Sequence, residues 1–80
     1  MLTLKEFNAL GEAEKAEVIW SGVFLADREE NGLIVQLFSL ENFYAEVFYD
    51  ANANKILRVR AFTALSQLTP YLAHVKFNIR

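Results

Sequence analysis

The side chains with the most evident chemistry are three ionisable residues in the middle of predicted strands. Glu46 lies in one such strand, and Arg58 and Arg60 lie in the next. Strand alternation places all three on the outer face of a sheet whose core face carries Val47, Leu57 and Val59. There they form a cross-strand ion pair, worth about 0.2–1 kcal/mol in water, or the arginines bind a carboxylate or phosphate in bidentate fashion. Glu46 competes for the arginines, so the ion pair is the favoured interpretation.

The other ionisable residues predict no catalytic centre. Asp27 and Glu29 share one face of a predicted strand, where they are solvated charges or, alternatively, a carboxylate pair that binds a cation or shares a proton. His74 is the single histidine, and we expect it near the end of the last helix, where a positive charge is favoured. Without cysteine there is no disulfide, thiolate metal site or thiol nucleophile. We therefore expect no catalytic, cofactor or metal site and no enzymatic activity.

Composition narrows the class of protein further. The 80 residues suit one domain, spanning 1–80, and a chain of this length buries only about 60–65% of its unfolded surface. The net charge of −2 argues against the phosphate attraction of nucleic-acid binders. No apolar run approaches the roughly 20 residues of a membrane helix, and no secretory signal is visible. We expect a cytoplasmic protein with neither nucleic acid nor membrane as partner.

The N-terminal segment predicts two short helices. Thr3 followed by Glu6 has the spacing of a capping box. Gly11 then interrupts the helical pattern, and Glu12 and Glu14 after it are typical of the acidic first turn of a new helix. The second helix should run from Glu12 to Trp20, with an inward side made of Ala13, Ala16, Ile19 and Trp20. A single helix from Leu4 to Trp20 is the alternative.

The next segment predicts a hairpin. Val23 to Glu30 and Leu33 to Ser39 flank Asn31-Gly32, which favours a type I′ turn because both residues tolerate positive φ. One face then pairs Glu30 with Leu33, Arg28 with Val35, Ala26 with Leu37 and Phe24 with Ser39. The other face pairs Glu29 with Ile34, Asp27 with Gln36 and Leu25 with Phe38. The first set has fewer polar residues, so we assign it to the core.

Two further strands complete an antiparallel meander. The third strand should run from Phe43 to Tyr49 and the fourth from Lys55 to Ala61, joined by the turn-forming loop from Asp50 to Asn54. The predicted fold is α+β: a four-stranded antiparallel meander with N-terminal and C-terminal helices packed mainly on one face.

The C-terminal segment predicts a helical region. The apolar residues at helical spacing are Leu65, Leu68, Leu72 and Val75. Thr69 is a candidate cap that places Pro70 in a first turn, so two short helices and one kinked helix both fit. Lys76 to Arg80 alternates again, as a strand or a loose tail.

Three stretches resemble a group of short uncharacterised bacterial proteins. They are Gly22 to Arg28, the strand from Phe43 through Tyr44, Glu46 and Tyr49 to Asp50, and Ile56 to Phe62 with Tyr71-Leu72 behind it. The resemblance covers most of the chain and implies the same order of helix, meander and helix. The group has no established activity, cofactor or catalytic residue to carry over.

The apolar content points to interaction rather than catalysis. The chain is 54% hydrophobic, and its predicted strands carry large apolar groups on both faces. The two short helical regions can cover one face, which leaves the other for a partner. We expect this outer face to bind a second copy or another protein through Ile34, Gln36, Phe38, Tyr44, Glu46, Phe48, Arg58 and Arg60. The alternative is a binding module for a small apolar or acidic ligand between sheet and helices. Aromatics and arginines also suit single-stranded nucleic acid, but the negative charge and the missing glycine-aromatic signature disfavour it.

Overall fold

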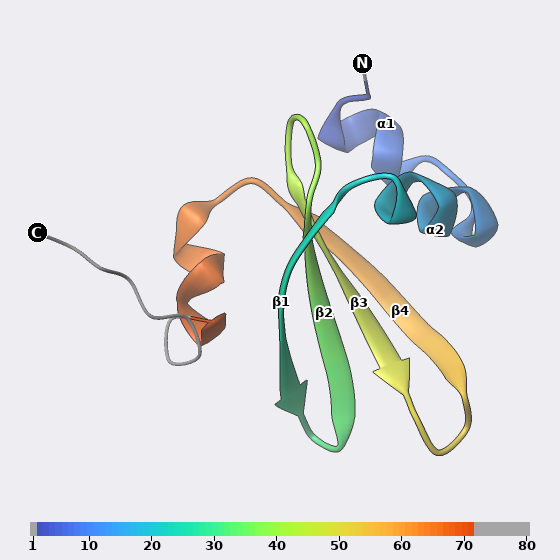
Figure 1. Cartoon of the computed structure of the whole chain (residues 1–80). Helices are drawn as coiled ribbons and strands as arrows, with labels where there is room; N and C mark the ends of the chain where they lie inside the picture. The colour runs from blue at the N-terminus through green and yellow to red at the C-terminus, as the bar shows by residue number, and fades with distance from the viewer. Residues whose placement is uncertain (1, 72–80) are drawn as a thin grey trace, which may run out of the picture.

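A computed structural model describes residues 2–71 and shows one four-stranded sheet with short helices at both ends of the chain (Figure 1). The elements in chain order are α1 (Leu4–Asn8), α2 (Glu12–Trp20), β1 (Val23–Glu30), β2 (Leu33–Ser39), β3 (Tyr44–Asp50), β4 (Lys55–Phe62) and the 3₁₀ helix η1 (Leu65–Tyr71). The strands are antiparallel in the order β1-β2-β3-β4. The predicted α+β meander is confirmed.

The helical elements divide between the two faces of the sheet. In Figure 1, α1 and α2 lie together beside the end of the sheet where β2 passes to β3, and η1 lies on the other side, next to β1. Both hairpin turns point away from α1 and α2. We call the face under α1 and α2 the helix face and the opposite one the η1 face. No helix among residues 2–71 is long and apolar enough to cross a membrane.

The N-terminus forms two helices, so the single-helix alternative is wrong. Glu6 N–H donates to the Thr3 hydroxyl at 3.1 Å, and Thr3 N–H donates to the Glu6 carboxylate at 2.9 Å, which completes the predicted capping box. At the start of α2, Gly11 N–H donates to the Glu14 carboxylate. Of the residues predicted to point inward, Ile19 is buried, whereas Trp20 is half exposed.

The first hairpin has the predicted turn and most of the predicted register. Asn31 and Gly32 both have positive φ, 52° and 81°, as a type I′ turn requires. The predicted pairs from Glu30 with Leu33 to Ala26 with Leu37 are present. The predicted partners of Phe24 and Leu25 are wrong, because an extra residue at Leu25 shifts the register and pairs Phe24 with Phe38 instead. Such a bulge interrupts the alternation of side chains.

A second bulge lies in the other edge strand. Phe48 pairs with Arg58 but Tyr49 pairs with Ile56, so Leu57 is the extra residue of β4. Leu57 is exposed, and its predicted place on the core face beside Val59 is wrong for this reason. Val59 does pack against the core.

The register between β2 and β3 corrects the predicted outer face. The tight link, closed by Leu40 N–H donating to the Phe43 carbonyl at 2.8 Å, pairs Gln36 with Val47 and Leu37 with Glu46. Directly paired residues share a face. The predicted set therefore splits: Ile34, Gln36 and Phe38 lie on the helix face, while Tyr44, Glu46, Phe48, Arg58 and Arg60 lie on the η1 face.

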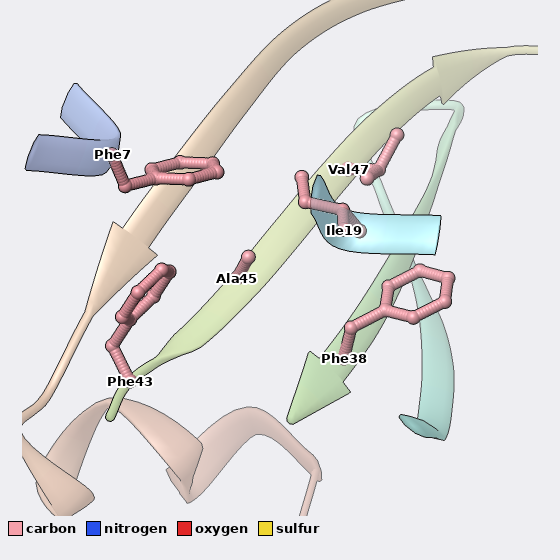
Figure 2. Close-up of a cluster of buried hydrophobic side chains, with 6 residues drawn as sticks. All are labelled: Phe7, Ile19, Phe38, Phe43, Ala45 and Val47. Carbon is pink, nitrogen blue, oxygen red and sulfur yellow. The ribbon is translucent and has the colours of Figure 1, made fainter. Parts of the chain in front are cut away.

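The main core lies between the helices and the sheet. Figure 2 shows the side chains from α1, α2, β2, β3 and the β2–β3 link that meet there: Phe7, Ile19, Phe38, Phe43, Ala45 and Val47. The Phe7 and Phe43 rings are 5.1 Å apart. This core occupies the end of the helix face nearest the β2–β3 link.

The η1 face has a smaller core of its own. Tyr71 of η1 packs with Leu37 and Phe62, against partly buried Ala26, Tyr44 and Leu68. The C-terminal helical region is a single 3₁₀ segment that includes Pro70. Thr69 is not its cap, because its hydroxyl donates to the Ser66 carbonyl at 2.7 Å.

The remaining C-terminal predictions, at Leu72, His74, Val75 and Lys76 to Arg80, lie outside the described residues. They stay predictions.

The turn geometry generates a test of the first hairpin. Gly32→Val should lower the free energy of unfolding by about 1 kcal/mol or more, because a β-branched residue is strained at positive φ. Urea denaturation followed by circular dichroism measures the change. Ala53→Val, at an exposed loop position without positive φ, is the matched control and should stay within about 0.5 kcal/mol of wild type. Equal midpoints for all three proteins would contradict the turn assignment.

Candidate functional site

The most unusual group in the molecule is the carboxylate of Glu46, which is fully buried on the η1 face. Its Oε1 accepts from Arg60 Nε at 2.8 Å and from Arg60 Nη2 at 2.5 Å. Its Oε2 accepts from Arg28 Nη2 at 3.2 Å and from the Tyr71 hydroxyl at 2.5 Å. We call these four residues the Glu46 cluster. Each carboxylate oxygen accepts two hydrogen bonds, as a buried charge requires.

Each member of the Glu46 cluster comes from a different element. Glu46 in β3 is directly opposite Arg60 in β4, which confirms the predicted cross-strand ion pair. Arg28 reaches over from β1, where it pairs with Val35 of β2. Tyr71 arrives from the end of η1. The cluster therefore ties both edge strands, a central strand and η1 together through one carboxylate.

The electrostatics of the cluster keep Arg28 charged and Tyr71 neutral. Arg28 also donates to Glu30 at 2.6 Å, and this hydrogen bond holds the pKa of Glu30 below its ordinary value. Burial by itself lowers the pKa of Arg28, but hydrogen bonds to Glu30, Tyr71 and Glu46 outweigh it and raise the pKa. Burial, and then the hydrogen bond to Glu46, raise the pKa of Tyr71 above its ordinary value.

Arg58 has a different role from Arg60. Its guanidinium carbon lies 4.0 Å from the centre of the Phe48 ring, a distance typical of cation–π stacking. Within residues 2–71 it forms no ion pair. Phe48 beneath it is buried, so the stem and head of Arg58 cover an aromatic ring that would otherwise face water.

The Glu46 cluster is built for structure rather than turnover. The carboxylate is sealed from solvent, and its oxygens are already engaged by groups of the chain itself. A substrate or metal ion would first have to displace Tyr71 or an arginine. We therefore assign the cluster the task of holding the sheet and η1 together.

The helix face has a part that α1 and α2 do not cover, and it begins at the last residue of α2. Its members come from α2 and all four strands: Trp20, Phe24, Ile34, Gln36, Tyr49 and Ile56. Five of them surround a shallow hollow of about 350 Å³ with Val47 at its floor, and Phe24 adjoins it through Phe38. Trp20 and Phe24 both meet the Phe38 ring edge-on, at 5.3 and 5.7 Å between centroids. We call these six residues the open apolar face.

Exposure identifies this surface as available to a partner. Trp20 is 51% exposed, Phe24 50% and Ile56 40%, and none of the six residues carries a charge. Asp27 and Glu29 lie beside it on β1, paired with Gln36 and Ile34, and both are exposed. The two predicted carboxylates thus share a face, but residues 2–71 contain no group of three or more potential metal ligands around them.

The structure brings together only part of the predicted interface. Tyr44, Glu46, Phe48, Arg58 and Arg60 do share a face, but Glu46 and Phe48 are buried within the chain and offer no surface. Ile34 lies in the open apolar face, and Phe38 lies beneath it.

The sequence analysis missed four residues that matter. Arg28 and Tyr71 complete the Glu46 cluster, while Trp20 and Phe24 dominate the open apolar face. The signal for Arg28 was the short β2–β3 link, which fixes Leu37 opposite Glu46 and so places Arg28 on the same face. No local pattern signals the bulge that turns Phe24 toward Phe38.

Removal of the buried charge should be strongly destabilising. Glu46→Gln keeps the shape but leaves Arg28 and Arg60 without their shared carboxylate, and we expect a loss of about 3 kcal/mol or more in the free energy of unfolding. Urea denaturation measures it. Glu29→Gln makes the same chemical change at an exposed position of β1 and should shift the value by no more than about 0.5 kcal/mol. Similar effects for both variants would argue against the cluster.

The raised pKa of Tyr71 predicts a loss of stability in alkali. The folded chain holds the Tyr71 proton more tightly than the unfolded chain, whose tyrosine titrates near pH 10, so stability should fall as the pH rises past about 10. This contribution is limited to about 1.4 kcal/mol per pH unit. The stability gap between wild type and Tyr71→Phe should therefore narrow between pH 8 and pH 11, as urea midpoints will show. Tyr44→Phe gives the baseline for the loss of a tyrosine hydroxyl, because the Tyr44 hydroxyl forms no hydrogen bond within residues 2–71. A constant gap for Tyr71→Phe would contradict the assignment.

Comparisons with known proteins do not indicate a role for the Glu46 cluster or for the open apolar face. No family model, no curated protein and no solved structure matches the chain. Function is therefore inferred from the contacts, charges and exposure of the chain's own residues.

Proposed function

We propose that this protein is a small, non-enzymatic interaction protein that self-associates through its open apolar face. The observation that carries the proposal is the exposure of Trp20, Phe24 and Ile56 around an uncharged hollow. Contiguous apolar patches on small proteins usually mark interaction sites. Aromatic side chains are also the groups that contribute most at interface centres.

The elements within residues 2–71 leave this surface uncovered. α1 and α2 pack at the end of the sheet near the β2–β3 link, where Phe7 and Ile19 meet Phe43 and Ala45. The open apolar face begins at Trp20, the last residue of α2, and at Phe24, which pairs with Phe38 of the main core. It extends from there toward the hairpin turns, which point away from both helices (Figure 1). Ile34, Gln36 and Tyr49 are consequently only half buried, although they lie in the two central strands of the sheet.

The charge distribution favours a second copy as the partner. Nothing at the centre of the open apolar face is charged, so two copies can bury it against each other without stranding a charge. With the two-fold axis beside Gln36, the two Gln36 side chains can hydrogen-bond each other, and away from the axis each residue of the patch meets a different residue of the same patch. Asp27 and Glu29 stand at the β1 rim, where they can keep their contact with water.

The same hollow supports a second candidate function. Its volume of about 350 Å³ lies within the range of small-molecule sites, and its lining is apolar apart from Gln36 and the Tyr49 hydroxyl. That hydroxyl is already hydrogen-bonded to Asn54. A small apolar ligand would therefore find one free polar group to orient it, and the protein would then function as a monomer.

The single tryptophan provides the test of self-association. Light scattering after size exclusion should give a mass that rises toward that of a dimer between about 1 μM and about 1 mM, the range of weak to moderate affinities. Over the same range, Trp20 emission should shift to shorter wavelength as its ring leaves water. A monomer with constant emission at all concentrations would overturn the proposal and leave the ligand function.

Two variants locate the contact. Phe24→Glu should abolish the rise in mass, because burial of an unpaired carboxylate at an apolar contact is energetically unfavourable. Leu65→Glu makes a similar change on η1, where Leu65 is exposed and lies outside the open apolar face, and it should associate like wild type. If Leu65→Glu alone prevented association, the interface would lie on the η1 face instead.

A further inference from the structure

A second groove runs between α2 and the edge of the sheet at β4, and it shares Ile56 with the open apolar face. It has a volume of about 330 Å³. Ala13 and Ala16 of α2 form one wall, and Ile56, Leu57, Arg58 and Val59 of β4 form the other. The small alanine side chains leave the space open, and Glu12 and Lys15, which also line it, balance each other in charge.

The groove follows the edge of β4 rather than one of its faces. Successive residues of a strand point to opposite faces, yet four consecutive residues of β4 line this groove. β4 is the last strand in the order β1-β2-β3-β4. Among residues 2–71 no strand neighbours the outer side of β4, so the backbone N–H and C=O groups there face the groove, which is the arrangement that accepts an added strand.

The side chains of β4 differ between its two faces. On the helix face, Val59 and Ala61 pack against the main core. On the η1 face stand Arg58 and Arg60, and β4 contains no acidic residue. Arg58 forms no ion pair within residues 2–71, and the Arg60 side chain remains 40% exposed beside Glu46.

We propose that this groove binds an extended segment of a partner protein in which apolar and acidic residues alternate. The segment pairs with β4 through its backbone. Its apolar side chains lie on the helix face beneath Ala13 and Ala16, and its carboxylates lie on the η1 face beside Arg58 and Arg60. Cross-strand pairs of opposite charge stabilise neighbouring strands. The bulge at Leu57 limits the regular part of β4, so the segment is short.

Synthetic peptides test this arrangement directly. A labelled peptide as long as β4, 8 residues, with alternating valine and glutamate, should bind when titrated with the protein in fluorescence anisotropy. The matching peptide of valine and lysine should bind at least about tenfold more weakly, because like charges then meet across the strands. Methylation of alternate backbone nitrogens in the glutamate peptide removes its donors and should abolish binding.

Variants of the protein separate groove binding from effects on folding. Ala16→Phe fills the groove and Arg58→Gln removes the charge, and each should weaken binding of the glutamate peptide by about fivefold or more. A fivefold loss of affinity corresponds to the upper end of the range for one exposed ion pair. Lys5→Gln makes the corresponding neutralisation on the exposed side of α1 and should bind like wild type. Far-UV circular dichroism confirms that each variant is folded.

The outcome is independent of self-association. The titrations are repeated with Phe24→Glu, which blocks the open apolar face and leaves the groove intact, and the affinity for the glutamate peptide should be unchanged. Equal affinity for the two peptides would overturn the acidic preference. Binding that survives backbone methylation, or no binding of either peptide up to about 1 mM, would overturn the groove as a strand-accepting site.

Discussion

The burial of one carboxylate, that of Glu46, is the constraint on which the rest of the structure depends. Placing an isolated charge in the interior costs several kcal/mol, so the chain must supply compensating donors at that point. It does so with Arg60 from the adjacent strand, Arg28 from the far edge strand and the Tyr71 hydroxyl from η1. The sheet and η1 satisfy this carboxylate only when all of them are in place.

This requirement also selects the register of the sheet. A slip of one residue between β2 and β3 would turn Glu46 toward the helix face, among Phe7, Ile19 and Phe38, whose side chains have no hydrogen-bond donor. The same slip would bring Ala45 and Val47 to the η1 face. Apolar packing alone distinguishes poorly between the native register and the slipped one, because both faces of the sheet carry large apolar residues. The buried charge supplies the distinction that the hydrophobic pattern lacks.

The elements were predictable from sequence because their signals are local. The capping box at Thr3, the Asn31-Gly32 turn and the antiparallel partners Glu46 and Arg60 all follow from residues close in the chain or from one register. The division of residues between the two faces was not predicted, because it depends on the register that the short link sets between β2 and β3. The bulges at Leu25 and Leu57, which carry no glycine and no polar marker, were not predicted either. Tyr71 joins the cluster through tertiary contact over a separation of 25 residues, which no periodicity reveals. The open apolar face was predicted as a property of the sheet, with Ile34 as a member, but its location follows from how little of the helix face two short helices cover.

The two bulges bear on how the protein behaves when crowded. An open meander presents two unpaired edges, which is the usual starting point for stacking strands into cross-β fibrils. Leu25 and Leu57 each insert one residue into an edge strand, so neither edge offers an unbroken, evenly spaced row of backbone groups to a whole strand of another copy. Short segments can still pair with part of an edge strand, but the bulges interrupt the backbone pairing wherever the edge strands of two copies would meet. At high concentration we therefore expect reversible association through the sheet faces rather than amyloid formation. The bulges at Leu25 and Leu57 would then be the features that limit pairing between the edge strands of different copies.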